Sequence, residues 1–156
     1  MASVPYETAT SGERALMEIQ KVLGKFGCQS FGTMTDAERG MTVVQFKYRE
    51  RQISLEASWK GYAGAWQKAH PWTSWTRGSR QEYDRKALEI GKVAVCSILR
   101  DWVKGQITAV ECGIMSFDAV FMPHMLLPTG ERVIDRVEST GMLPKPEDKK
   151  VLEFKP

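Results

Sequence analysis

The stretch SWKGYAGAWQKAHPWTSWTRGSRQEYDR, residues 58–85, decides how the rest of the chain can be arranged. It holds four of the five tryptophans of the protein. A tryptophan ring needs a large surface in which to be buried or on which to stack. These rings therefore either fill a core between a sheet and a long helix or, in part, form a platform for a flat ligand. Burial is the commoner outcome for any single tryptophan, and the sequence leaves both interpretations open.

Positive charge is concentrated in the same part of the chain. The protein has 156 residues and a formal net charge of +3. Residues 45–86 contain nine lysines and arginines but only four acidic residues, so the rest of the chain is slightly acidic. A basic region that coincides with a cluster of aromatic residues favours an anionic partner.

Length and composition are typical of one soluble globular domain, with 42% hydrophobic and 26% charged residues. No apolar run approaches the roughly 18 to 20 residues that cross a bilayer, so no membrane partner is expected. The first residues lack the organisation of a secretory signal. The three cysteines show no CxxC spacing, which indicates reduced thiols and a cytoplasmic location.

Upstream of the tryptophan-rich stretch, the apolar pattern predicts a helix and three strands. Apolar residues at helical spacing predict a first helix over residues 11–26, which ends at Gly27. Residues 28–34 predict an edge strand. Residues 41–58 alternate on both sides of a polar turn at residues 49–51, which predicts a hairpin with one solvent-exposed face.

Downstream, Ser79 and Glu82 match a capping box and predict the start of the longest helix, which runs to Cys112. Residues 59–78 predict a long connection between hairpin and helix, because two glycines and a His-Pro pair interrupt regular structure there, although residues 64–69 could form a helical turn. Long connections in compact domains are often functional, so the stretch is also a candidate site.

The predicted fold class is therefore α+β with a single domain at residues 11–139. A small antiparallel sheet, made of the hairpin plus the edge strand, packs against the N-terminal helix and the long helix. Residues 1–10 are predicted to form a flexible N-terminus, and residues 140–156 a loose C-terminal tail.

No catalytic signature is present in the sequence. His70 and His124 have no metal-type spacing to a second ligand. Cys96 lies on the apolar stripe of the long helix, and Cys112 lies at the negative end of the helix dipole, which disfavours a thiolate. The GxSxG, Walker, GxGxxG and HExxH motifs are all absent. The sequence thus predicts a non-catalytic protein with no cofactor and no metal site.

Binding of nucleic acid or of a nucleotide has the strongest physical support, because aromatic faces and cationic groups together hold single strands. The predicted contact residues are the aromatic and basic side chains of the stretch and three basic residues of the hairpin. They are Lys47, Arg49, Arg51, Trp59, Lys60, Trp66, Lys68, Trp72, Trp75, Arg77 and Arg80. The same residue types are enriched in protein interfaces, so the alternative is a protein that inhibits a host bacterial factor by direct contact. The sequence also leaves a homodimer open.

Residues 99–133 carry short motifs that resemble small uncharacterised accessory proteins of bacteriophages and prophages. The motifs are Val110-Glu-Cys-Gly-Ile, Ser116-Phe-Asp, Phe121-Met-Pro and Leu127-Pro-Thr-Gly. The segment VVQFKYRERQISLEASW, residues 43–59, resembles the strand pair of the same proteins. Cys112 and Asp118 stand where that family has a small residue and a glutamate. The resemblance implies a phage accessory protein of the host cytoplasm that handles nucleic acid or disarms a host defence, and it brings no catalytic residue.

Overall fold

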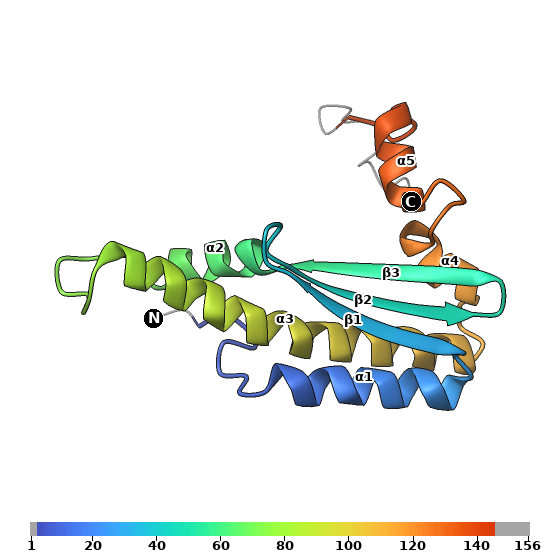
Figure 1. Cartoon of the computed structure of the whole chain (residues 1–156), viewed down its shortest axis with the longest axis horizontal. Coiled ribbons are helices and arrows are strands. Elements are labelled where there is room, and N and C mark those ends of the chain that lie inside the picture. The colour runs from blue at the N-terminus through green and yellow to red at the C-terminus, as the bar shows by residue number, and fades with distance from the viewer. Residues whose placement is uncertain (1–2, 146–156) are drawn as a thin grey trace, which may run out of the picture.

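The computed structural model describes residues 3–145, in which a three-stranded antiparallel sheet packs on two helices (Figure 1). The strand order is β1-β2-β3, so the predicted α+β class with a hairpin and an edge strand is confirmed. The elements in chain order are α1 (Gly12–Phe26), β1 (Ser30–Asp36), β2 (Met41–Tyr48), β3 (Arg51–Ser58), α2 (Trp59–Ala69), α3 (Arg80–Glu111), α4 (Phe117–Phe121), the 3₁₀ helix η1 (Met122–His124) and α5 (Val133–Thr140).

The hairpin of β2 and β3 is closed by a turn of two residues. Tyr48 pairs with Arg51, so Arg51 belongs to the strand rather than to the turn. Arg49 adopts a φ of 52°, the left-handed conformation that tight hairpin turns demand. Val44 lies opposite Leu55 in the register, and both are buried, as the alternation predicts.

The helices α1 and α3 cover one face of the sheet (Figure 1). The side chain of Ser11 caps α1 by accepting a hydrogen bond from the Arg14 N–H, and Gly27 ends the helix with a φ of 110°. From α1, Ile19 and Leu23 are fully buried against the sheet. From α3, the main core residues are Val103 and Ile107. Both predicted long elements are thus confirmed with boundaries within two residues.

The segment predicted as a long connection begins with a regular helix, so that prediction was wrong for its first half. Ser58 accepts a hydrogen bond from the Gly61 N–H and starts α2, which continues to Ala69. The buried residues Trp59, Ala63 and Trp66 recur at helical spacing on the side that faces α3. Packing of this apolar side outweighs the low helix propensity of the two glycines in α2.

The close approach of α2 and α3 depends on Gly91. A Cβ atom at this position would lie 2.7 Å from the carbonyl oxygen of Trp59 and 3.5 Å from the backbone nitrogen of Ala63. Real Cβ atoms do not approach backbone atoms so closely, so any side chain here would push the two helices apart. Gly105 lies on the same helix and would meet no atom within 4 Å.

The N-terminal segment lies against α2 and α3 over residues 3–10, within the part predicted to be flexible. The hydroxyl of Tyr6 donates to Asp101 on α3 (2.6 Å), and the hydroxyl of Tyr62 donates to the carbonyl oxygen of Pro5 (2.6 Å). At the other end of the chain, α5 ends at Thr140 near the predicted boundary, and residues 146–156 of the predicted tail lie outside the described residues.

Substitution of Gly91 by alanine should destabilise the protein even though alanine is the better helix former. The added methyl meets the backbone of α2, and overpacking of this kind costs about 1 to 3 kcal/mol. The matched control is Gly105→Ala, which meets open space and should stabilise the fold by up to about 1 kcal/mol. Urea unfolding followed by circular dichroism measures both changes. Equal effects of the two substitutions would contradict the close packing of α2 on α3.

Candidate functional site

The structure places eight of the eleven predicted contact residues at two ends of the molecule, whereas Trp59, Lys60 and Trp66 lie between these ends. The connection between α2 and α3 lies at one end, and the turn between β2 and β3 lies at the other (Figure 1). We call residues 68–80 the tip; they comprise the end of α2, the connection and the first residue of α3. Lys68, Trp72, Trp75, Arg77 and Arg80 belong to the tip, whereas Lys47, Arg49 and Arg51 belong to the hairpin end. One continuous basic and aromatic surface is therefore not formed.

Two of the four tryptophans of the predicted platform are core residues, which corrects the expectation for these rings. Trp59 and Trp66 are each 8% exposed. The indole N–H of Trp59 donates to the Thr42 hydroxyl (2.8 Å), which ties α2 to β2. Trp66 packs against Tyr83, with ring centroids 5.8 Å apart. Neither ring presents a face on which a base could stack.

Trp72 is half-buried at the base of the tip. Its ring packs against Tyr83 with centroids 5.4 Å apart, and the guanidinium of Arg80 lies 5.7 Å from its centroid. The same guanidinium lies 5.3 Å from the Tyr83 ring and makes an ion pair with Asp84 (3.5 Å). The tip thus has a rigid aromatic base with one cation held over it.

Trp75 extends from this base into solvent. It is 91% exposed, the largest exposure among the large hydrophobic side chains of residues 3–145. The nearby cations Lys68 and Arg77 are exposed and make no ion pair or hydrogen bond within the described part of the chain. Glu82 is the nearby acid, and its side chain folds back over Gly78, which has a φ of 84°. The tip therefore offers one free indole face and free positive charge.

Hydrogen bonds hold the start of the tip and a small turn within it. The hydroxyl of Tyr83 donates to the carbonyl oxygen of His70 (2.7 Å), and the His70 ring hydrogen-bonds to the Glu7 carboxylate (2.7 Å). Within the tip, the Thr73 N–H donates to the hydroxyl of Thr76 (3.0 Å), and the Thr76 N–H donates to the Thr73 carbonyl (3.0 Å). Trp75 lies inside this small turn.

The basic residues of the hairpin end have different surroundings. Arg51 pairs with Asp118 on α4 (3.2 Å), and the guanidinium of Arg49 lies 5.1 Å from the Tyr48 ring centroid. Lys47 lies on the sheet face away from α1 and α3 and, within residues 3–145, has no acidic partner. Lys60 belongs to neither end, because its side chain packs beside Gly40.

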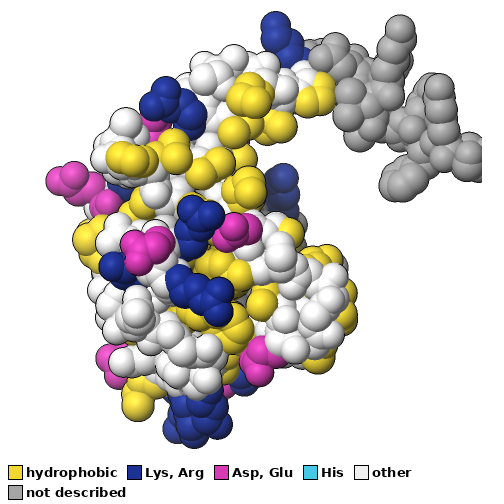
Figure 2. Space-filling model, turned by 90° about the vertical axis from the view of Figure 1, so that its right-hand side faces the viewer, with side chains coloured by type: hydrophobic (Ala, Val, Ile, Leu, Met, Phe, Trp, Pro, Cys, Tyr) yellow, Lys and Arg dark blue, Asp and Glu magenta, His cyan; other side chains and the backbone are white. Residues whose placement is uncertain are grey.

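A groove at the hairpin end was not found from the sequence. It has a volume of about 550 Å³, and its apolar wall comes from the segment between α4 and α5: Met122, Met125, Leu126, Leu127, Pro128 and Val133. Figure 2 shows hydrophobic side chains gathered along the projecting arm of α5 and on the body below it. Met122, on this wall, is 49% exposed. The spacing of apolar residues in the sequence could not predict the groove, because its walls come from two segments that are far apart in the chain, residues 47–52 and 118–133.

Burial shifts the pKa values of two thiols and one imidazole toward their uncharged forms. Burial raises the pKa of the Cys28 thiol to about 11 and also raises the pKa of Cys96, so both stay protonated. Burial, together with the positive charge of Arg132, lowers the pKa of His124. Residues 3–145 contain no group of three potential metal ligands and no helix that could cross a membrane.

Comparisons with protein-family models, with curated proteins and with solved structures gave no match.

The division between core and exposed tryptophans predicts unequal effects of their removal. Trp66→Ala should lower the free energy of unfolding by about 3 to 5 kcal/mol, because it opens a cavity between α2 and α3. Trp75→Ala is the matched control and should change it by less than about 0.5 kcal/mol, because this ring is exposed. Urea unfolding at pH 7 gives both values. A large loss of stability in Trp75→Ala would contradict its position at the surface.

The lowered pKa of His124 predicts a loss of stability in mild acid. The unfolded state binds a proton near the ordinary histidine pKa of 6.5, whereas the folded state resists it, so stability falls as the pH drops below about 6.5. The unfolding free energy should therefore fall between pH 7 and 5 more steeply in the natural protein than in His124→Gln. Asp101 and Asp135, whose pKa values are lowered by their arginine partners, act below about pH 4. Parallel pH profiles of the two proteins would contradict the assignment.

Proposed function

We propose that this protein is a non-catalytic accessory protein of bacteriophage type that binds a single-stranded nucleic acid, or a nucleotide, at the tip. The observation that carries the proposal is the 91% exposure of Trp75 in the same connection as Arg77, which makes no ion pair with any residue among 3–145. An exposed indole offers a large flat face on which a base can stack. The acceptor oxygens of a phosphate suit the free charges of Lys68 and Arg77.

The tip suits an unpaired base better than a duplex. An indole face that extends from a small turn can stack on a base whose own face is free, as in single strands and loops. The guanidinium of Arg80 over the half-buried Trp72 adds positive charge at the base of the tip. The contact set is therefore smaller than the sequence predicts, and it suits one or two nucleotides rather than a long strand.

A protein partner is the second candidate function, and the groove at the hairpin end favours it. Methionine and leucine side chains adapt to irregular surfaces and line recognition grooves for polypeptides. The free Lys47 at the rim of this groove suits an acidic partner. In this alternative the protein inhibits a host defence or replication factor by direct contact.

The resemblance of residues 99–133 to phage accessory proteins supports both candidates equally. It places the protein in the cytoplasm of a bacterial host, where reduced thiols are the rule. The cysteines Cys28, Cys96 and Cys112 are free, which agrees with such a location.

The test is binding of a fluorescently labelled single-stranded DNA oligomer, followed by anisotropy at two salt concentrations. An RNA oligomer and a DNA duplex serve as the competing probes. Trp75→Ala should weaken binding about 5- to 150-fold, which corresponds to the roughly 1 to 3 kcal/mol of one stacked base. Arg77→Ala should weaken binding and reduce the magnitude of the salt slope by about 0.7, because one phosphate contact is lost.

The matched control is Arg49→Ala, which removes an exposed arginine at the opposite end of the molecule. It should leave the affinity and the salt slope unchanged. An equal effect of Arg49→Ala and Arg77→Ala would show that the charge acts without a defined site. Absence of binding to every probe at low salt would overturn the proposal and leave the protein partner as the function.

A further inference from the structure

The two edges of the sheet differ. At one edge, the Leu126 N–H donates to the carbonyl oxygen of Gln52 (2.8 Å) and Met125 forms a bridge with Ile53, so the start of β3 is covered. At the other edge, β1 pairs with β2 alone. No other segment among residues 3–145 pairs with β1.

The backbone of β1 presents three residues outward at this edge. In an antiparallel ladder, successive residues of a strand bond alternately to its two sides. The Trp59 N–H donates to the carbonyl of Gly40, and the Gln29 N–H donates to the carbonyl of Lys47, so the odd-numbered residues of β2 bond to β1. With the observed register, the outward residues of β1 are Phe31, Thr33 and Thr35.

The usual devices that protect a free edge are missing from β1. Natural edges carry lysine, proline or inward charges that prevent another strand from pairing. The sequence SFGTMTD contains no lysine, arginine or proline. Its one charge, Asp36, is already held by the Arg39 N–H (3.0 Å). The strand is seven residues long, which is enough for a full pairing partner.

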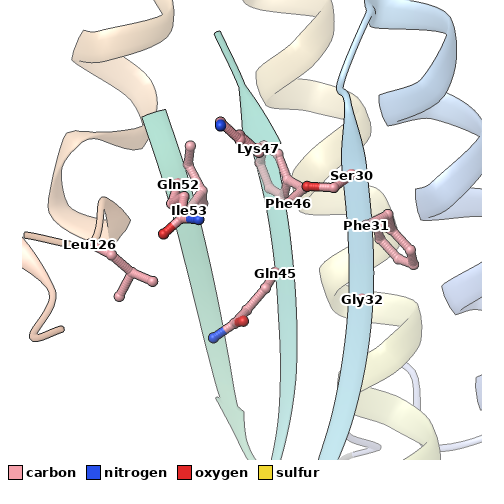
Figure 3. Close-up of a pocket in the computed structure, with 9 residues that line it drawn as sticks. All are labelled: Ser30, Phe31, Gly32, Gln45, Phe46, Lys47, Gln52, Ile53 and Leu126. Atoms are coloured by element: carbon pink, nitrogen blue, oxygen red, sulfur yellow. The ribbon is translucent and has the colours of Figure 1, made fainter. Parts of the chain in front are cut away.

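A hollow lies on the sheet face beside this edge (Figure 3). It exists because Gly32 has no side chain, and a Cβ there would meet no atom within 4 Å. The volume is about 250 Å³, below the roughly 300 to 1,000 Å³ typical of small-molecule sites but enough for one aromatic side chain. Lys47, without an acidic partner in the described residues, lines it together with Gln45 and Gln52.

From the free edge and the hollow, we infer that β1 is a docking site for an extended segment of another protein. The segment pairs as a fourth strand with the outward groups of Phe31, Thr33 and Thr35. It places an aromatic side chain across from Gly32, where cross-strand rings commonly cover an edge glycine. It places a carboxylate two residues further on, across from Ser30 and within reach of the Lys47 ammonium group.

A second copy of this chain fits the edge less well than an isolated strand. The helix α1 lies on the outer side of β1, away from β2, in both Figure 1 and Figure 3. Pairing of β1 with itself would bring two copies of α1 into the same layer, whereas helices need 8–10 Å between their axes. An extended segment carries no helix and meets no such obstacle. This inference does not depend on the proposed function of the tip.

The test uses the synthetic peptide acetyl-TVTFTET-amide and the isotope-labelled full chain in NMR titrations. Paired antiparallel, this probe places phenylalanine across from Gly32 and glutamate across from Ser30. Saturable shifts of the Phe31, Thr33 and Thr35 amides are expected. The peptide acetyl-TVTATET-amide, which lacks the ring, should bind at least tenfold more weakly.

Two variants of the protein separate the edge from the hollow. Gly32→Val adds a side chain whose Cβ would meet no atom within 4 Å, occupies the hollow and should weaken the binding at least tenfold. Thr33→Pro removes an outward N–H that the β1–β2 ladder does not use and should abolish the shifts. Gly105→Ala is the control, because its added methyl meets open space on α3, and it should bind the peptide as the natural protein does.

Three results would overturn the inference. The first is the absence of saturable shifts at the edge. The second is a shift pattern centred on the groove of residues 122–133, which would place the peptide elsewhere. The third is sedimentation as a dimer that Thr33→Pro dissociates, which would make a second copy the occupant of the edge.

Discussion

The contact between the backbone of α2 and Gly91 of α3 is the constraint on which the rest of the structure depends. Because no side chain separates the helices there, α2 can approach closely enough for its own residues Trp59 and Trp66 to be buried. The hydrogen bond from Trp59 to Thr42 then fixes α2 to the sheet. With α2 in place, the N-terminal segment has a surface to cover, and the tip is held at the far end of α3. A glycine in the middle of a helix is otherwise unfavourable, so its presence is explained by this packing.

Most of the fold could be predicted because its signals are local. The alternation in β2 and β3, the stripe of α1 and the cap at Ser79 each report the conformation of neighbouring residues. The helix α2 was missed because its local signals conflict: Gly61, Gly64 and the following proline indicate a break, whereas Trp59 and Trp66 recur at helical spacing. Burial of the two rings against α3 favours the helix. This burial depends on the contact of Gly91 with Trp59, which a pattern in a single sequence cannot predict.

The candidate site was predicted in part, for a related physical reason. The excess of positive charge over residues 45–86 is a property of the chain, whereas a binding surface is a property of the fold. Arg49 lies in the turn between β2 and β3, and Arg77 lies in the connection between α2 and α3. These two connections are at opposite ends of the molecule, although both belong to the same basic region of the sequence (Figure 1). The exposure of each tryptophan is also a property of the fold, because the sequence does not distinguish a buried ring from a solvent-exposed one.

The free edge of β1 depends on how the strands of the sheet pair, which the sequence alone does not determine. Hydrophobic alternation predicts that a strand exists, but the pairing of residues 125–126 with the start of β3 makes the two edges of the sheet different. β1 carries outward backbone groups that no other segment of residues 3–145 pairs. A sequence selected only for a soluble monomer would place a lysine or proline on such a strand, because an open edge invites unwanted pairing. β1 has threonines and a glycine instead. The absence of protection therefore argues that pairing at this edge is used, and it separates a polypeptide surface from the cationic tip at the end of α3.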